Sequence, residues 1–219
     1  MTGHPGIFVL AGTNGAGKSS IGGEVFTRND GAYFNPDEIT KVILQANPWM
    51  TLDEANGLAW QQGLRTLKAS IANGFRYAFE TTLGGRTITE TLLDAAQRGI
   101  KVYMWYCALA APQLHIERVA ARVRRGGHDI PEQKIRERYD ESRRNLLRLL
   151  PHLEVLRVYD NSEESTLIPQ PLLILEMRAR RIVHADVRVT PNWAKPIVAA
   201  AFAVDPPFAT TARPTRKKK

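Results

Sequence analysis

Apolar and polar positions along this chain predict strands and helices in alternation. Short apolar runs, each as long as a buried strand, are separated by longer segments with helical periodicity. The predicted strands are 7–10, 32–34, 76–80, 100–110 and 153–159, and the predicted helices are 18–28, 36–46, 52–72, 87–98 and, with a break, 112–150. Strands and helices that alternate in this way form a mainly parallel sheet with helices on both faces, so we expect an α/β three-layer sandwich.

Cap residues mark several of these boundaries. Asn35 is expected to cap a helix that begins at Pro36. Thr51 should cap the next helix, which ends at Asn73-Gly74 because glycine adopts the left-handed backbone that ends helices. The two helices are therefore predicted as separate elements.

The pattern changes after the fifth predicted strand. Residues 171–177 and 180–189 alternate like an antiparallel pair, and residues 193–202 predict a closing helix. With no internal repeat and no low-complexity linker before position 205, we expect one domain over residues 1–204 and a disordered basic tail over 205–219.

The net charge of +8 on 219 residues raises the question of a nucleic-acid partner. Half of that charge belongs to the tail, which carries Arg213, Arg216, Lys217, Lys218 and Lys219 against Asp205. No aromatic residues interleave with basic ones as they do on a nucleic-acid platform. Nucleic-acid binding is therefore the minor alternative.

Neither a signal peptide nor a membrane span is predicted. The N-terminus has no basic region before its short apolar run, and no stretch is long enough to cross a bilayer. The single cysteine, Cys107, lies within an apolar run and is expected to be a buried structural thiol. A cytoplasmic protein is expected.

The first predicted strand leads into a phosphate-binding motif. Residues 12–19, GTNGAGKS, satisfy G-x-x-x-x-G-K-[ST] at every fixed position. Glycines let successive N–H groups point at phosphate oxygens, Lys18 provides a charge for the β- and γ-phosphates, and the Ser19 hydroxyl can ligate Mg²⁺. The residues expected to bind ATP are Gly12, Thr13, Asn14, Gly15, Ala16, Gly17, Lys18, Ser19 and Ser20.

Ligands of parallel sheets bind at the carboxyl ends of strands, where few polar residues are available. Asp37 follows the second strand and is expected to orient an acceptor hydroxyl and take its proton. The alternative is that its charge merely stabilises the N-terminus of a helix. The fifth strand offers Asp160 and Asn161 at the same edge.

Glu80 ends the third predicted strand, where a Mg²⁺-associated acid is expected. It could instead accept hydrogen bonds from substrate hydroxyls, or be purely structural. The polar loop that follows includes Thr81, Thr82 and Arg86, which would suit a hydroxylated or phosphorylated substrate.

The segment 112–150 predicts a helical lid. It is rich in arginine, and Gly126-Gly127 between its two helices could act as a hinge. Arg118 and Arg122 share a helix face, and Arg138 is a third candidate for neutralising charge on the transferred phosphoryl group. For most of these arginines the alternative, a solvated helix face, holds.

Several motifs in order, GTNGAGKSS, NPDEI, FETTL, RVAARVRRGGHDIPEQKIRERY and YDNS, resemble the zeta-toxin-like family of small phosphate-loop kinases over residues 7–162. The resemblance implies phosphorylation of UDP-N-acetylglucosamine by ATP with Mg²⁺, and an antitoxin protein as a partner. It also implies that Asp37 is the base, that Glu80 and the neighbouring threonines meet the substrate, and that Arg122 and Arg138 steady the γ-phosphate.

We therefore expect an ATP- and Mg²⁺-dependent kinase that acts on a small hydroxylated acceptor, a UDP-amino sugar. Catalysis is assigned to Asp37, Lys18, Arg122 and Arg138, and metal binding to Ser19 and Glu80. The alternatives are a nucleotide-controlled ATPase switch and a kinase of nucleic-acid 5′ ends.

Overall fold

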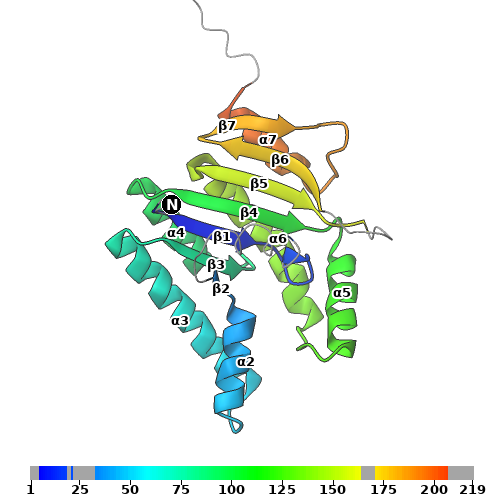
Figure 1. Cartoon of the computed structure of the whole chain (residues 1–219). Coiled ribbons are helices and arrows are strands. Elements are labelled where there is room, and N and C mark those ends of the chain that lie inside the picture. Colours follow the sequence, from blue (N-terminus) through cyan, green and yellow to red (C-terminus); the bar gives the residue numbers. More distant parts are fainter. Residues whose placement is uncertain (1–4, 19–20, 22–32, 164–170, 207–219) are drawn as a thin grey trace, which may run out of the picture.

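A seven-stranded sheet forms the centre of the protein. The computed structural model describes residues 5–18, 21, 33–163 and 171–206. Within them the strand order is β2-β3-β1-β4-β5-β6-β7 (Figure 1). The first five strands in this order are parallel, and β6 and β7 add to the edge in antiparallel pairs. The predicted α/β fold class and the closing antiparallel pair are confirmed.

The elements follow the predicted order closely. The strands are β1 Ile7–Ala11, β2 Tyr33–Phe34, β3 Tyr77–Thr81, β4 Val102–Ala108, β5 Val155–Asp160, β6 Leu172–Arg178 and β7 Arg181–Ala185. The helices are α2 Pro36–Ala46, α3 Leu52–Asn73, α4 Arg86–Gln97, α5 Pro112–Arg124, α6 Glu132–Leu149, the short 3₁₀ helix η2 Leu150–His152, and α7 Lys195–Val204. Apart from Lys18 and Ile21, which are helical, the helix predicted over 18–28 lies outside the described residues, as does most of the predicted tail.

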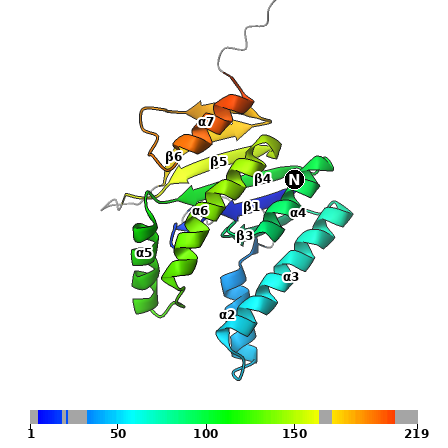
Figure 2. The ribbon, with the colours of Figure 1, turned by 180° about the vertical axis from the view of Figure 1, so that it is seen from behind.

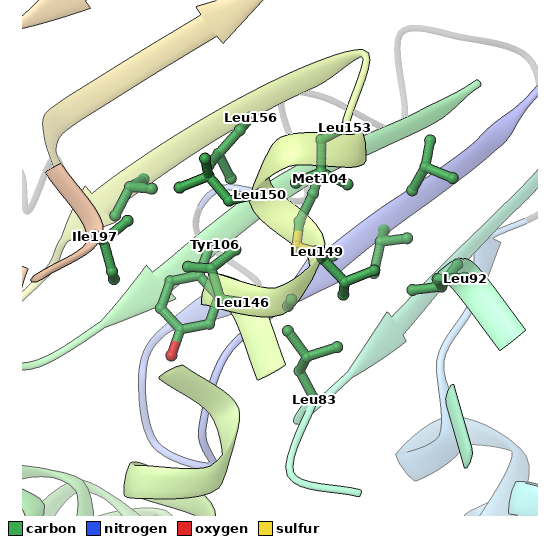
Figure 3. Packing of buried hydrophobic residues seen from close by; sticks show 14 of the residues in the cluster. Leu83, Leu92, Met104, Tyr106, Leu146, Leu149, Leu150, Leu153, Leu156 and Ile197 are labelled. Carbon is green, nitrogen blue, oxygen red and sulfur yellow. The ribbon is translucent and has the colours of Figure 1, made fainter. Parts of the chain in front are cut away.

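The main core covers one face of the sheet. Figure 2 shows α4, α6 and α7 in front of the strands. In Figure 3, Leu146 and Leu149 of α6 lie close to Met104 and Tyr106 of β4, all four fully buried. Alternate residues of the same strands point to the opposite face, where Leu10, Trp105 and Cys107 pack with Ala16 and Ile21 of the segment after β1.

The predicted caps are present. The Asn35 side chain accepts a hydrogen bond from the Asp37 amide at 2.9 Å at the start of α2. Thr51 and Glu54 form a reciprocal capping box on α3, and Gly74 ends that helix with φ of 67°. These local signals separate α2 and α3 into an antiparallel pair that extends beyond the sheet (Figure 1).

The α5–α6 pair has a small hydrophobic cluster of its own. Ile116 and Val119 of α5 pack with Ile130 and Ile135 at the start of α6, apart from the main core. The C-terminal half of α6 belongs to the main core through Leu146 and Leu149. The lid predicted over 112–150 therefore has two parts. The C-terminal half of α6 packs against the sheet, whereas α5 and the following turn contact the sheet little.

The membrane prediction can be checked on the helices. Across the described ranges, none of them combines the length and the apolar composition needed to cross a bilayer.

Candidate nucleotide and acceptor site

The phosphate loop follows β1 and is in close contact with Asn161, the residue after β5. Gly15 and Gly17 have positive φ of 80° and 82°. A Cβ at Gly17 would lie 2.2 Å from Nδ2 of Asn161, so only glycine fits there. That Asn161 amide donates to the carbonyl of Ala16 at 2.9 Å. The residue after β5 thus supports the loop, a role that its position at the strand end did not by itself reveal.

Lys18 lies beneath the loop with only 7% of its surface exposed. Its ammonium donates to the Gly12 carbonyl at 2.8 Å and lies 3.3 Å from Oε1 of Glu80. The buried charge is therefore neutralised by a carboxylate on the neighbouring strand, as burial of an ammonium requires. The two predicted site residues, from β3 and the loop after β1, are brought together.

Glu80 has a second partner that the sequence interpretation missed. The Tyr33 hydroxyl, on β2, donates to Oε2 of Glu80 at 2.6 Å. Burial, and then the adjacent Glu80 carboxylate, raises the pKa of Tyr33, so its hydroxyl stays protonated. The signal available in the sequence was the position of Tyr33 just before the Asn35-Pro36-Asp37 segment.

Asp37 lies in the first turn of α2 and faces the turn after α5. Its Oδ2 is 3.6 Å from Nη1 of Arg122, and its Oδ1 is 3.7 Å from Nε2 of His128. The Asp37 carboxylate is 39% exposed, so these ion pairs are modest and a ligand can replace them. The candidate base and one candidate lid arginine thus meet directly.

Arg122 is positioned by its own turn. Its Nη2 donates to the carbonyl of His128 at 3.1 Å, and the Gly127 amide donates to the Arg122 carbonyl at 3.0 Å. A Cβ on Gly127 would lie 2.6 Å from Cγ of Arg122. The Gly126-Gly127 segment, interpreted from sequence as a hinge, thus also makes room for the arginine side chain.

Arg138 approaches the phosphate loop from α6. Its Nη1 donates to Oδ1 of Asn14 at 2.8 Å. Burial lowers the pKa of the Arg138 guanidinium, and the nearby Asp37 carboxylate acts in the opposite direction. Arg138 and Arg122 therefore reach the site from different helices.

His115 of α5 is a support that the sequence interpretation did not identify. It is completely buried, and its Nδ1 lies 2.8 Å from the Asn14 carbonyl oxygen. Burial lowers the pKa of His115 to about 4, so the ring is neutral near pH 7 and donates from Nδ1. No sequence signal separates this histidine from an ordinary core residue.

A cavity of about 850 Å³ opens above these residues. Its lining includes Lys18 and Glu80, then Asp37, Arg118, Arg122 and His128, and also Lys41, Leu44, Leu52 and Arg125. The lining therefore combines the phosphate-loop lysine with acidic, cationic and apolar side chains.

Three predicted substrate residues lie elsewhere. The Thr81 hydroxyl accepts from the Leu83 amide at 3.0 Å, and the Thr82 hydroxyl accepts from the Gly84 amide at 3.4 Å. Arg86 is exposed at the start of α4, and none of the three lines the cavity. Their contact with a substrate remains a prediction.

The residues predicted to bind the metal are Ser19 and Glu80. Ser19 and Ser20 lie outside the described residues, and within the described part no group of three or more His, Cys, Asp or Glu side chains could hold a metal. The Glu80 carboxylate is nevertheless a hard oxygen donor beside Lys18, which fits a Mg²⁺ ion that is bound mainly through phosphates. The donor set present is thus compatible with the predicted ion.

The glycine-rich loop follows the buried strand β1 and leads into the helical residue Lys18, and neighbouring parallel strands carry acidic residues at their ends. This arrangement is typical of the phosphate-loop kinase fold. A model of the zeta toxin family matches residues 1–172. The chain belongs to the zeta toxin family.

Individual relatives are more distant. An uncharacterized protein of Haemophilus influenzae is 27% identical over 133 residues, which cover 58% of this chain and 88% of that protein. Among solved structures, AvrRxo1-ORF1:AvrRxo1-ORF2 with sulphate ions matches with a TM-score of 0.62 at 14% identity, over 91% of this chain and 64% of that one. The same complex with ATP matches with a TM-score of 0.61 at 15% identity, over 91% and 64%.

A third solved structure, described as the PezAT chromosomal toxin-antitoxin system of Streptococcus pneumoniae, matches with a TM-score of 0.51 at 17% identity, over 73% of this chain and 69% of that one. At these identities the likeness shows the fold. The chain spans 64% of the length of the chain that it matches in the AvrRxo1-ORF1:AvrRxo1-ORF2 structure.

Proposed function

We propose that the protein is an ATP- and Mg²⁺-dependent kinase that phosphorylates a hydroxyl of a UDP-amino sugar such as UDP-N-acetylglucosamine. The observation that carries this proposal is the shared cavity, in which Lys18 of the phosphate loop and Asp37 of α2 line one continuous space. A triphosphate held at Lys18 and a hydroxyl held at Asp37 can therefore meet there.

The proposed reaction is a direct phosphoryl transfer. The acceptor oxygen attacks the γ-phosphorus of ATP, the bond from that phosphorus to the β–γ bridging oxygen breaks, and ADP leaves. The acceptor proton passes to the Asp37 carboxylate. Arg122, which lies 3.6 Å from Asp37, is placed to neutralise charge on the transferred group.

Lys18 and Glu80 prepare the donor end. A bound triphosphate would take over the Lys18 ammonium from Glu80, because phosphate oxygens carry more charge than one carboxylate. Mg²⁺, which Ser19 and Glu80 would hold, supplies further charge neutralisation on the phosphates when bound. Tyr33 keeps Glu80 in place during this exchange.

The acceptor class rests on the cationic and apolar residues that line the cavity and on the family. Lys41 and Arg125 offer charge for a diphosphate, and Leu44 and Leu52 offer apolar surface for a base or sugar ring. This composition suits a nucleoside diphosphate sugar, which carries both kinds of group.

We further propose a small antitoxin protein as a partner and the cytoplasm as the location, with the kinase domain over residues 1–204 and a separate basic tail. The PezAT structure is described as a toxin-antitoxin system, and this likeness supports the partner. Copurification of the chain with a coexpressed neighbouring gene product would test it.

The function is tested with γ-labelled ATP, Mg²⁺ and purified UDP-N-acetylglucosamine, with UDP and ADP-ribose as competing acceptors, and products are identified by mass spectrometry. Label on the sugar of UDP-N-acetylglucosamine is the expected result. Release of all label as inorganic phosphate would instead favour the ATPase switch. Label on oligonucleotide 5′ ends, with binding that weakens steeply with salt, would favour a nucleic-acid kinase.

A further inference from the structure

Arg138 is held by groups on two different loops. The Asn14 side chain of the phosphate loop accepts a hydrogen bond from the Arg138 guanidinium at 2.8 Å, and the Thr13 hydroxyl donates to the main-chain carbonyl of Arg138 at 3.3 Å. Gly84, in the loop after β3, lies against the aliphatic part of the Arg138 side chain. The guanidinium is therefore fixed at the phosphate loop before any ligand contributes.

Gly84 is close to Arg138 in a way that its neighbour Gly85 is not. A Cβ at position 84 would lie 2.7 Å from Cγ and 3.2 Å from Cβ of Arg138. A Cβ at position 85 would meet nothing within 4 Å, and Gly85 has an ordinary φ of −115°. The two adjacent glycines thus differ in the space that they leave for Arg138.

The loop that carries Gly84 has little freedom to retreat. Leu83 is fully buried with a φ of 54°, and its carbonyl accepts from the Asn145 side chain of α6 at 2.9 Å. The Gly84 amide is bonded to the Thr82 hydroxyl at 3.4 Å. A methyl group added at position 84 would therefore displace the Arg138 side chain and not the loop.

We propose that Asn14 and Gly84 are positioning residues for Arg138: Asn14 holds the guanidinium over the phosphate loop, and Gly84 leaves the space that its stem needs to reach there. The proposal rests on the proposed function and on the expectation from the family resemblance that Arg138 contacts the γ-phosphate of ATP. It assigns a role to a glycine outside the nucleotide-binding motif.

The test measures how much the γ-phosphate contributes to binding, so it needs no acceptor. Affinities of the full chain for ADP and for a non-hydrolysable ATP analogue, both with Mg²⁺, are measured by calorimetry and expressed as a ratio. In Arg138→Ala and in Gly84→Ala the preference for the triphosphate should fall about tenfold, because each loses one charge-assisted contact to the phosphate. Gly85→Ala should keep the original ratio.

The double variant separates positioning from a general structural effect. Gly84→Ala should add nothing to Arg138→Ala, since the side chain that it displaces is already gone. An additive loss, or equal behaviour of Gly84→Ala and Gly85→Ala, would overturn the proposal. If Arg138→Ala itself leaves the ratio unchanged, both the positioning proposal and the expected contact of Arg138 with the γ-phosphate are wrong.

A second variant covers the case in which Gly84→Ala does not fold. Asn14→Ala removes the acceptor of the guanidinium and should lower the ratio about tenfold, again with no further loss in the Arg138→Ala background. An additive effect there would also overturn the proposal. Failure to phosphorylate UDP-sugars would contradict the proposed acceptor while leaving this binding ratio unaffected.

Discussion

Asp37 is held between two kinds of interaction at the edge of the cavity. Its own amide is bonded to the Asn35 side chain, which sets the start of α2, and its carboxylate faces Arg122 and His128. The backbone contact is local and persistent, whereas the ion pairs are half-exposed and easily replaced. The carboxylate is therefore fixed in position and still accessible to an acceptor hydroxyl.

Replacing this carboxylate should separate catalysis from binding. Asp37→Asn keeps the shape and removes the proton acceptor, so we expect kcat to fall about 100-fold or more with little change in ATP affinity. Steady-state kinetics and calorimetry measure the two quantities. Asp53→Asn, in the first turn of α3, is the control for loss of a helix N-terminal charge and should keep full activity. Full activity of Asp37→Asn would remove it from the chemistry.

Lys18 should matter for binding itself. The ammonium is buried against the loop carbonyls and Glu80, and Lys18→Ala leaves that carboxylate unpaired beside the incoming phosphates. We expect affinity for Mg²⁺-ATP to fall about tenfold or more, as measured by calorimetry. Lys68→Ala, exposed on α3, should bind normally. Unchanged affinity in Lys18→Ala would speak against the phosphate-loop assignment.

At the scale of elements, α5 is tied to the phosphate loop by a buried histidine. His115 meets the Asn14 carbonyl, and a Cβ on Gly15 would lie 2.6 Å from the carbonyl oxygen of His115. Helix and loop are therefore in direct backbone contact. Movement of the lid is accordingly expected in the turn around Gly126-Gly127, whereas the start of α5 stays with the loop.

This burial makes stability depend on pH. Because the pKa of His115 is lowered to about 4 in the folded state, the unfolded chain binds the proton first as pH falls. The contribution of His115 to the free energy of unfolding is fully present above about pH 6.5 and should be lost as the pH falls to about 4. The expected loss is about 3 kcal/mol.

Urea unfolding at several pH values measures this effect. His115→Asn places an amide donor near the original Nδ1 and cannot titrate, so its stability should depend less on pH between 6.5 and 4. His152→Asn, at an exposed position, should behave like the unchanged protein. Identical pH profiles for the chain and His115→Asn would show that His115 does not titrate as described.

For the whole molecule, the single thiol reports on the integrity of the sheet. Cys107 is completely buried in the central strand β4, and its Sγ lies 3.1 Å from the Ala16 carbonyl of the phosphate loop. Burial raises the pKa of the Cys107 thiol to about 12, so little thiolate forms near neutral pH. The prediction of a buried structural thiol is thereby confirmed.

Thiol labelling should therefore follow unfolding of the whole domain. We expect no reaction with a water-soluble disulfide reagent in native buffer and one equivalent in urea, monitored by absorbance. Added Mg²⁺-ATP should slow labelling at intermediate urea, because a ligand bound to the native state raises its stability. Rapid labelling of the native protein would mean that the sheet opens locally at β4.

Much of the fold was predictable from sequence because its causes are local. Apolar runs of strand length, the caps Asn35 and Thr51, and Gly74 at a left-handed position each act within a few residues, and the structure places elements where they predict. The phosphate loop was predictable for the same reason, since its glycines, Lys18 and preceding strand are contiguous. The boundaries shifted slightly where tertiary pairing extended a strand, as at Thr81, which pairs with Ala11 of β1.

The sequence by itself determined the alternation of strands and helices, the phosphate loop and the short set of acids at strand ends. Only the tertiary structure decided that Tyr33 fixes Glu80, that His115 supports the loop, and that Arg138 reaches Asn14 from 124 residues away. These contacts depend on distances between elements that are far apart in the chain. No local preference encodes such distances, because they are set by how the whole sheet and its helices pack together.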